Sequence, residues 1–449
     1  MHTHDPALTE LVLDQVRGRL QREGALLNHP GQPDKLAHTL TGLIGADGND
    51  PADVMRLYTD HLAPTAIACD SPRFLSFIPA APTQAAVLFD MLVSCSSIQG
   101  VSWMLAAGPV AAENQVLQLL ADLAGMPDTA GGCFVSGGSA GNLSALVTAR
   151  DTARQQRGFG AHSPVRIALS DQAHSSIINT LRIIGVEPLL VPTRDHRLTG
   201  ADLRVALQAD ADPSNVIAVV ATAGTTNAGI IDDLATIAEA AREFGLWFHI
   251  DGAYGGAGLL APSVRDRYRG IEHADSLVVD PHKWLFAPLD CAALLYRDPA
   301  LAKAAHAQDA SYLDVLQTDG ESEWNPSDYA YHLSRRARGL PLWFSLAVHG
   351  TGAYTDAIER ALSLSRQSAE LIRTAPHVEL IREPDLSVVL FRRPGWSTSD
   401  YQAWSNRLLA DQTAFVAPTG WNGETVCRFA FLHPATSLDM VREILDTMV

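Results

Sequence analysis

The sequence predicts an α/β fold in which a largely parallel sheet carries helices on both faces. From residue 165 to residue 296, short runs rich in apolar and β-branched residues alternate with amphipathic patterns of helical period. This alternation is typical of chains whose parallel strands are joined by helices. The seven strand candidates are a short run after Gly131 and the segments Val165–Ser170, Pro188–Pro192, Val216–Thr222, Trp247–Asp251, Ser276–Val279 and Ala292–Tyr296, with helical patterns near 175–184, 199–209 and 232–244.

Composition and charge exclude several classes of protein. The 449 residues are 47% hydrophobic and contain no run of about 18 apolar residues that would span a membrane. The net charge of −17 opposes attraction to nucleic acid or anionic lipid. Met1–Asp5 does not begin a secretory signal, so a cytoplasmic location is expected. Five scattered cysteines without CxxC pairs are expected to be reduced, and no metal site is predicted.

Changes in pattern divide the chain into three parts. Residues 1–82 carry helical patterns near 8–27, 34–44 and 51–63 and form an arm, whose amphipathic faces need the body of the chain or a second subunit to cover them. Residues 83–342 form the large domain. Residues 343–449 form a small α+β domain with strand-like Ser387–Arg392, a helix Ser399–Ala410 and strand-like Cys427–Phe431.

Three segments lie outside the regular alternation. Ser71–Pro82 is apolar and punctuated by prolines, so its side chains either line a site or pack as a core loop. Pro109 is expected to open a helix that runs to about Ala124. Residues 301–333 are polar and irregular, which is typical of a lid or binding loop.

Lys283 is the predicted chemical centre. It follows the strand Ser276–Val279 through a turn at Pro281, which places the amine at a strand end. Trp284 and Phe286 should surround its base with apolar groups, which disfavours the ammonium form and favours attack on an aldehyde. A lone lysine is more often an ordinary surface residue, but surface lysines seldom stand among such neighbours.

The segment from Gly131 to Leu146 reads as a strand, a turn of small residues and a helix. Backbone N–H groups at such a helix start bind phosphate, although similar turns also occur only for packing. The turn lacks both GxGxxG and the GKS or GKT of a P-loop.

Asp251 and Lys283 complete a pattern with this turn. A turn for phosphate, a lysine for a Schiff base and a strand-end aspartate that keeps a pyridine nitrogen protonated match the chemistry of pyridoxal phosphate. Asp251 alone would equally cap a helix. His174 follows a strand where an imidazole would stack on the ring, and the small Ala253 would back its other face.

The sequence resembles the group II pyridoxal phosphate dependent decarboxylases, the family of aromatic L-amino acid decarboxylase. The resemblance runs from about residue 70 to 345 and rests on Asp280–Trp284, Asp171–Ser175, Ala221–Thr226 and Trp247–Asp251. It implies a fold type I homodimer with active sites between subunits, pyridoxal 5′-phosphate as cofactor and an amino acid as substrate.

The resemblance also implies roles for individual residues. Lys283 would be the Schiff-base lysine and Tyr312, on the polar loop, the proton donor that favours decarboxylation over aldehyde formation. The remaining cofactor contacts would be Ala140, Gly141, His174, Thr222, Asp251, Ala253, Asp280 and His282. The substrate pocket would use Phe77, Ile78, Pro79, Ala80 and Leu289, with Val101 and Trp103 from the neighbouring subunit.

Two departures from animal relatives concern the residues around the phosphate. Gly141 replaces a serine, and Asp280 replaces an asparagine and is therefore expected to turn away from the phosphate. The apolar pocket favours an aromatic substrate such as tryptophan, tyrosine or phenylalanine, with a bulky aliphatic amino acid as the alternative. Two rival functions remain: another fold type I enzyme, such as an aldehyde synthase, aminotransferase or carbon-carbon lyase, and a cofactor-binding protein without activity.

Overall fold

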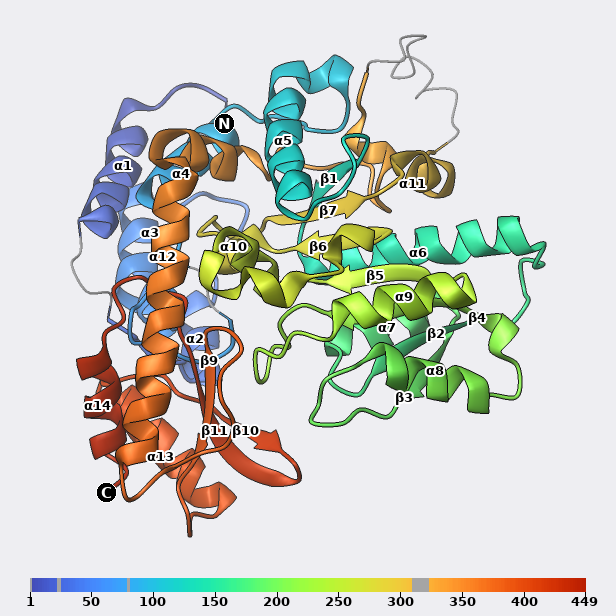
Figure 1. Cartoon of the computed structure of the whole chain (residues 1–449). Helices are drawn as coiled ribbons and strands as arrows, with labels where there is room; N and C mark the ends of the chain where they lie inside the picture. The colour runs from blue at the N-terminus through green and yellow to red at the C-terminus, as the bar shows by residue number, and fades with distance from the viewer. Residues whose placement is uncertain (1, 22–25, 79–80, 309–322) are drawn as a thin grey trace.

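A computed structural model describes residues 2–21, 26–78, 81–308 and 323–449 (Figure 1). Its centre is a seven-stranded sheet in the order β1-β7-β6-β5-β4-β2-β3. The strands are β1 (Gly131–Val135), β2 (Arg166–Ser170), β3 (Glu187–Val191), β4 (Val216–Thr222), β5 (Trp247–Asp251), β6 (Ser276–Val279) and β7 (Ala292–Tyr296). Only β7 runs against its neighbours, β1 and β6, so the predicted mostly parallel sheet is confirmed.

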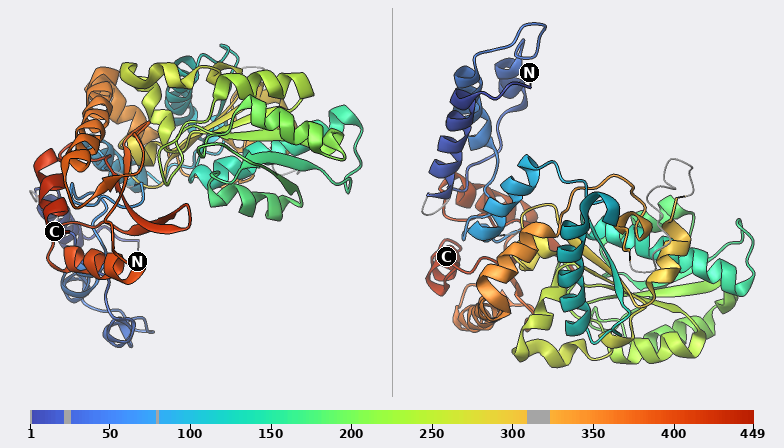
Figure 2. Two further views of the ribbon diagram at one scale, coloured as in Figure 1. Left: turned by 60° about the horizontal axis from the view of Figure 1, so that its bottom comes forward. Right: turned by 90° about the horizontal axis from the view of Figure 1, so that it is seen from above.

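Helices cover both faces of this sheet (Figure 2). One face packs against α6 (Gly138–Arg157), α7 (Ser175–Ile184) and α11 (Pro299–His306). The other packs against α5 (Trp103–Leu123), α8 (Gly200–Ala209) and α9 (Leu234–Phe244). Every residue of β1, β4, β5, β6 and β7 is buried, which explains why these strands read as continuous apolar runs.

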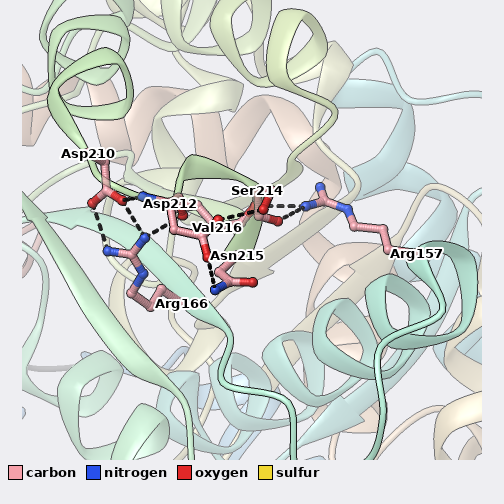
Figure 3. Close-up of polar contacts among 7 residues, drawn as sticks. All are labelled: Arg157, Arg166, Asp210, Asp212, Ser214, Asn215 and Val216. Carbon is pink, nitrogen blue, oxygen red and sulfur yellow. Dashed lines mark hydrogen bonds and ion pairs between the residues drawn. The ribbon is translucent and has the colours of Figure 1, made fainter.

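Arg157 and Arg166 form hydrogen bonds near the amino ends of β2 and β4 (Figure 3). This edge lies opposite the carboxyl ends of the strands, where ligands bind in such sheets. Both guanidinium Nη atoms of Arg166 donate to the Asp210 carboxylate, at 2.7 and 2.6 Å. Arg157 donates to the carbonyl oxygens of Ser214 at 2.9 Å and Val216 at 3.0 Å. These contacts tie the end of α6 and the start of β2 to the loop that enters β4.

The N-terminal helices project away from the body of the chain and bury little of themselves (Figure 2). None of the residues in α1 (Pro6–Leu20), α2 (Pro33–Leu40) or α3 (Pro51–Leu57) is buried. Apolar side chains including Leu8, Val12 and Ile44 are exposed there. The arm therefore presents an apolar surface within this single chain.

The C-terminal part holds a second sheet in the order β10-β11-β9-β8. Its strands are β8 (Glu379–Leu380), β9 (Val388–Arg392), β10 (Pro418–Trp421) and β11 (Glu424–Ala430), with α13 (Thr398–Ala410) and α14 (Leu438–Asp446) beside them. α12 (Leu340–Thr374) leads into this part and breaks at Gly350, whose φ of 73° lies in the left-handed region.

Some boundaries differ from the sequence prediction. α5 begins at Trp103 rather than at Pro109, because the Ser102 hydroxyl accepts the N–H of Leu105 and caps an additional turn. Pro109 cannot donate to the carbonyl four residues earlier, and the helix is kinked at Ala106. Helices α4 (Gln84–Cys95), α11 and α14 were not predicted.

None of the helices in the described ranges combines the length and apolar character needed to cross a membrane. The same residues contain no group of three or more His, Cys, Asp or Glu side chains placed to hold a metal ion. All five cysteines are free thiols, three of them buried.

Candidate active site

The carboxyl ends of three neighbouring strands bring the predicted residues together. Thr222 ends β4 and pairs in register with Asp251, which ends β5. β6 leads into the short helix α10 (Pro281–Trp284), which carries Lys283. Because β4, β5 and β6 run parallel, all three residues lie at one edge of the sheet.

Asp251 is buried and held by two donors. Its Oδ2 accepts from Asn142 Nδ2 at 2.9 Å, and its Oδ1 accepts from the backbone N–H of Ala253 at 3.1 Å. Only 4% of the residue is exposed. A carboxylate so desolvated is stabilised by these bonds and by any cation brought to the strand end.

Lys283 forms an ion pair with Asp280 one helical turn earlier. The Nζ–Oδ2 distance is 2.9 Å, and Asp280 is only 2% exposed. Burial lowers the pKa of the Lys283 amine, but the charge and hydrogen bond of Asp280 outweigh it and hold the pKa above its ordinary value. The predicted shift toward the free amine is therefore wrong. That Asp280 turns away from the phosphate stays a prediction, because its ion pair with Lys283 does not show where a phosphate would lie.

The first turn of α6 closes tightly on these residues. A Cβ atom on Gly138 would lie 2.9 Å from Asp280 Oδ2 and 3.0 Å from the Cβ of Ala253. A Cβ on Gly141 would lie 2.8 Å from Cγ2 of Val278. No side chain caps the amino end of α6. The small residues thus let the helix start approach the strand ends with its N–H groups free of a side-chain cap.

His174 is the residue before α7, at the carboxyl end of β2. Its Nδ1 accepts from the backbone N–H of Ser176 at 3.2 Å, and the Ser176 hydroxyl lies 2.9 Å from the same atom. His174 lines an open pocket of about 350 Å³, together with residues of its own loop and of the β10–β11 turn such as Trp421. Its ring is therefore oriented through Nδ1, while the imidazole remains exposed to a ligand.

His282, the residue before Lys283, is held in place by a hydrogen bond to its imidazole ring. Its Nδ1 accepts from the backbone N–H of Cys291 at 3.0 Å, and its Nε2 lies 3.7 Å from Asp280 Oδ2. Burial lowers the pKa of this imidazole. The neutral ring packs within reach of Gly137 at the start of α6.

The predicted substrate residues are dispersed. Phe77 is 62% exposed, Ile78 is half-buried against the core and Leu289 is exposed. Val101 is buried within its own chain, and Trp103 is half-buried at the start of α5. Tyr312, Pro79 and Ala80 fall outside the described residues. The Thr83 N–H donates to the Phe286 carbonyl at 3.0 Å, which holds the segment after Phe77 beside α10.

Sequence reasoning missed three residues near this edge. Arg428 on β11 donates to the Phe77 carbonyl at 2.9 Å, and its other terminal nitrogen, Nη1, is buried without a hydrogen-bond partner among the described residues. The Phe415 ring lies 5.1 Å from that of Phe74 and 6.2 Å from that of Phe77. The third is Asn142. Arg428 and Phe415 stand more than 330 residues from Phe77, so no local pattern joins them.

Comparison with known proteins decides the family. The model of the pyridoxal-dependent decarboxylase conserved domain matches residues 35–393. The chain belongs to the pyridoxal-dependent decarboxylase family. This decarboxylase is therefore a pyridoxal phosphate dependent carboxy-lyase, and its seven-stranded sheet is that of fold type I.

Relatives of the decarboxylase differ in the substrates that their names give. Aromatic-L-amino-acid decarboxylase of Bacillus atrophaeus is 30% identical over 424 residues, or 92% of this chain and 88% of that enzyme. L-2,4-diaminobutyrate decarboxylase of Rhizobium meliloti is 31% identical and covers 92% of this chain and 83% of that enzyme. The crystal structure of Oryza sativa TDC with PLP and tryptamine has a TM-score of 0.90 at 25% identity and covers 99% of both chains.

The strand-end residues of the decarboxylase fit pyridoxal phosphate. The Thr222 hydroxyl and Asp280 Oδ1 are buried without hydrogen-bond partners among the described residues, at the edge where the cofactor is expected. The uncapped start of α6 supplies donors for a phosphate, and Asp251 supplies an anion for a ring nitrogen. These are the groups that a phosphorylated pyridine aldehyde requires beside a lysine.

Proposed function

We propose that this decarboxylase converts an aromatic L-amino acid into the corresponding amine and carbon dioxide. The observation that carries the proposal is a cluster of three aromatic rings, Phe74, Phe77 and Phe415, together with the buried Arg428, whose guanidinium donates to the Phe77 carbonyl. Aromatic rings favour a flat apolar side chain, and a guanidinium favours a carboxylate. The similarity to aromatic-L-amino-acid decarboxylase over most of both chains supports the same substrate class.

In this proposal, cofactor binding is divided among the residues at the strand ends. Lys283 binds the cofactor aldehyde, Asp251 holds a proton at the ring nitrogen and His174 stacks on the ring. Thr222 and Ala253 contact the ring. Ala140, Gly141, Asp280 and His282 surround the phosphate end. When bound, the cofactor would supply an electron-withdrawing ring that stabilises negative charge left at Cα.

The chain's own groups orient and protonate the substrate. We assign the substrate carboxylate to Arg428, whose buried Nη1 has a donor to spare among the described residues. The bond between Cα and the carboxylate carbon breaks, carbon dioxide leaves, and the electron pair stays on the Cα side. A proton delivered to Cα completes the amine. Tyr312 is the proposed donor of that proton.

The proposed assembly is a homodimer with the active site at the subunit interface. Its support is the apolar surface of the N-terminal arm, where α1, α2 and α3 bury no residue within this chain. A second copy would cover that surface, as the amphipathic patterns require. Val101 and Trp103 would then reach the partner's substrate pocket. We further propose a cytoplasmic location, because free thiols suit a reducing compartment.

Incubation of the purified holoenzyme with each of the twenty amino acids, and with L-2,4-diaminobutyrate, tests the substrate class. Mass spectrometry of the products should find tryptamine, tyramine or phenethylamine, with one carbon dioxide per amine and no requirement for an oxo acid. Lys283→Ala should produce none. An aliphatic or diamine product would contradict the aromatic substrate, and aldehyde or oxo-acid-dependent product would contradict simple decarboxylation.

A further inference from the structure

A buried chain of hydrogen bonds extends from Asp251 into the sheet. Asn142 Nδ2 lies 2.9 Å from Asp251 Oδ2, and Asn142 Oδ1 lies 2.9 Å from His249 Nε2. His249 Nδ1 lies 2.8 Å from the Ser276 hydroxyl, which accepts from the Trp247 indole N–H at 2.8 Å. Asn142, His249 and Ser276 are each at most 1% exposed. Sequence analysis assigned none of these three a role.

The direction of every bond in this chain follows from its two ends. Trp247 has only an N–H to offer, and the Asp251 carboxylate can only accept. Asn142 must therefore donate its amide N–H to Asp251 and present its carbonyl oxygen to His249. That oxygen requires a proton on His249 Nε2, so His249 Nδ1 accepts from the Ser276 hydroxyl. The donors all point toward Asp251.

His249 is suited to this fixed orientation because it is neutral. Burial lowers the pKa of its imidazole to about 4, although the charge of Asp251 opposes the change. A neutral ring has one donor and one acceptor, and each meets the single partner that suits it. The Nε2–H tautomer is thereby selected across the physiological pH range.

Asn142 also reaches the residue on the opposite side of the site. Its Nδ2 lies 3.4 Å from the Ser176 hydroxyl, which lies 2.9 Å from His174 Nδ1. The Ser176 N–H also donates to His174 Nδ1, so that nitrogen is an acceptor and His174 keeps its proton on Nε2. One amide group is thus connected to both Asp251 and His174.

We propose that Asn142 is a positioning residue that sets the Asp251 carboxylate and the His174 imidazole in one fixed relation, with His249 and Ser276 holding its amide the right way round. The inference rests on the proposed roles of Asp251 and His174 at the cofactor. Asn142 itself does not touch the reacting atoms. Loss of the Asn142 amide leaves the buried Asp251 carboxylate with one hydrogen-bond donor fewer. The Asp251 side chain is then expected to shift, and cofactor binding to weaken.

The test compares four variants in the assembled holoenzyme and in the cofactor-free protein. Asn142→Leu removes the amide, His249→Leu removes its anchor, and His249→Gln retains an N–H for the Asn142 oxygen. Thr148→Val is the matched control, since Thr148 is a buried polar residue of the same helix that bonds Ser144 and His306 instead. Cofactor affinity, the pH dependence of the bound-cofactor absorption band and histidine ¹⁵N shifts are measured.

Asn142→Leu and His249→Leu should weaken cofactor affinity by about 10-fold to 100-fold. His249→Gln should restore most of the loss. Thr148→Val should keep cofactor affinity within about threefold of the parent, because Thr148 bonds Ser144 and His306 and neither Asp251 nor His174. The ¹⁵N shifts of the cofactor-free protein should show His249 neutral with its proton on Nε2 between pH 5 and 8.

Parent-like affinity in Asn142→Leu, an equal loss in Thr148→Val, or a proton on His249 Nδ1 would overturn the inference. Failure of the proposed function has a different signature. It leaves the His249 tautomer unchanged in the cofactor-free protein, because that measurement requires neither cofactor nor substrate, while no amino acid yields an amine.

Discussion

Replacing Gly141 with serine should destabilise the protein, which accounts for the glycine in the phosphate turn. A Cβ at this position would lie 2.8 Å from Cγ2 and 3.1 Å from Cγ1 of Val278. Carbon atoms pack best at about 3.5–4.0 Å, so the helix and β6 would have to separate by roughly 0.7 Å or more. Both sides of the contact are buried, and neither is the end of a flexible side chain.

Two opposing effects determine how much Gly141→Ser changes the free energy of unfolding. Overpacking of this kind costs about 1–3 kcal/mol. Serine has a higher helix propensity than glycine, which offsets about 0.5 kcal/mol. Overpacking therefore dominates, and Gly141→Ser should lower the free energy of unfolding by about 0.5–2.5 kcal/mol. Urea titration at unchanged m-value measures this loss.

Two controls separate packing from propensity. Gly18→Ser lies in α1 with no atom within 4 Å of the new Cβ, so propensity alone should stabilise it by about 0.5 kcal/mol. Val278→Ala removes the obstructing methyl groups, so the double variant with Gly141→Ser should lose less stability than the two single losses added together. A stable Gly141→Ser protein, or strictly additive losses, would refute the packing explanation.

Three further predictions concern ion pairs. Asp280→Asn should lower the pKa of the Lys283 amine, so that an amine-directed acylating reagent labels the cofactor-free variant faster at pH 8; an unchanged rate would contradict the pairing. Arg335→Met removes the ion-pair partner of the buried Glu113 carboxylate in α5 and should lower the free energy of unfolding by about 3–5 kcal/mol. Urea titration measures this loss, and replacing Glu113 as well should recover part of it. The hydrogen bond from Arg166 lowers the pKa of Asp210 to about 2, so the pair stabilises the fold above about pH 4 and its contribution is lost as pH falls toward 2; Arg166→Gln should differ from the parent at pH 6 and converge with it near pH 2 in thermal unfolding.

Much of the fold was predictable because its strands are buried on both faces. Trp247–Asp251 reads as a mostly apolar run, interrupted by His249, with a carboxylate at its end, and the strand is buried throughout. α4 and α14 were missed, although α14 is strongly amphipathic, because short helices at the margin of a domain depend on tertiary packing. The start of α5 was misplaced because Pro109 gives a stronger local signal than the cap at Ser102.

The site was predictable where chemistry is local in sequence. Lys283 and its turn could be read from one segment, yet the sign of its pKa change depended on where the Asp280 side chain points. Arg428 and His249 carried no local signal, since their partners stand on distant segments. Asn142 lies in the first turns of α6, just after the small-residue turn, but its function appears only when α6 is packed against β5.

Peptide mapping after borohydride reduction of the holoenzyme tests the central assignment most directly. Reduction should fix the cofactor to one nitrogen, and digestion followed by mass spectrometry should find a single pyridoxyl group on the peptide that contains Lys283. A pyridoxyl group on Lys303 or any other lysine, or a loaded enzyme that yields no modified peptide, would contradict the account.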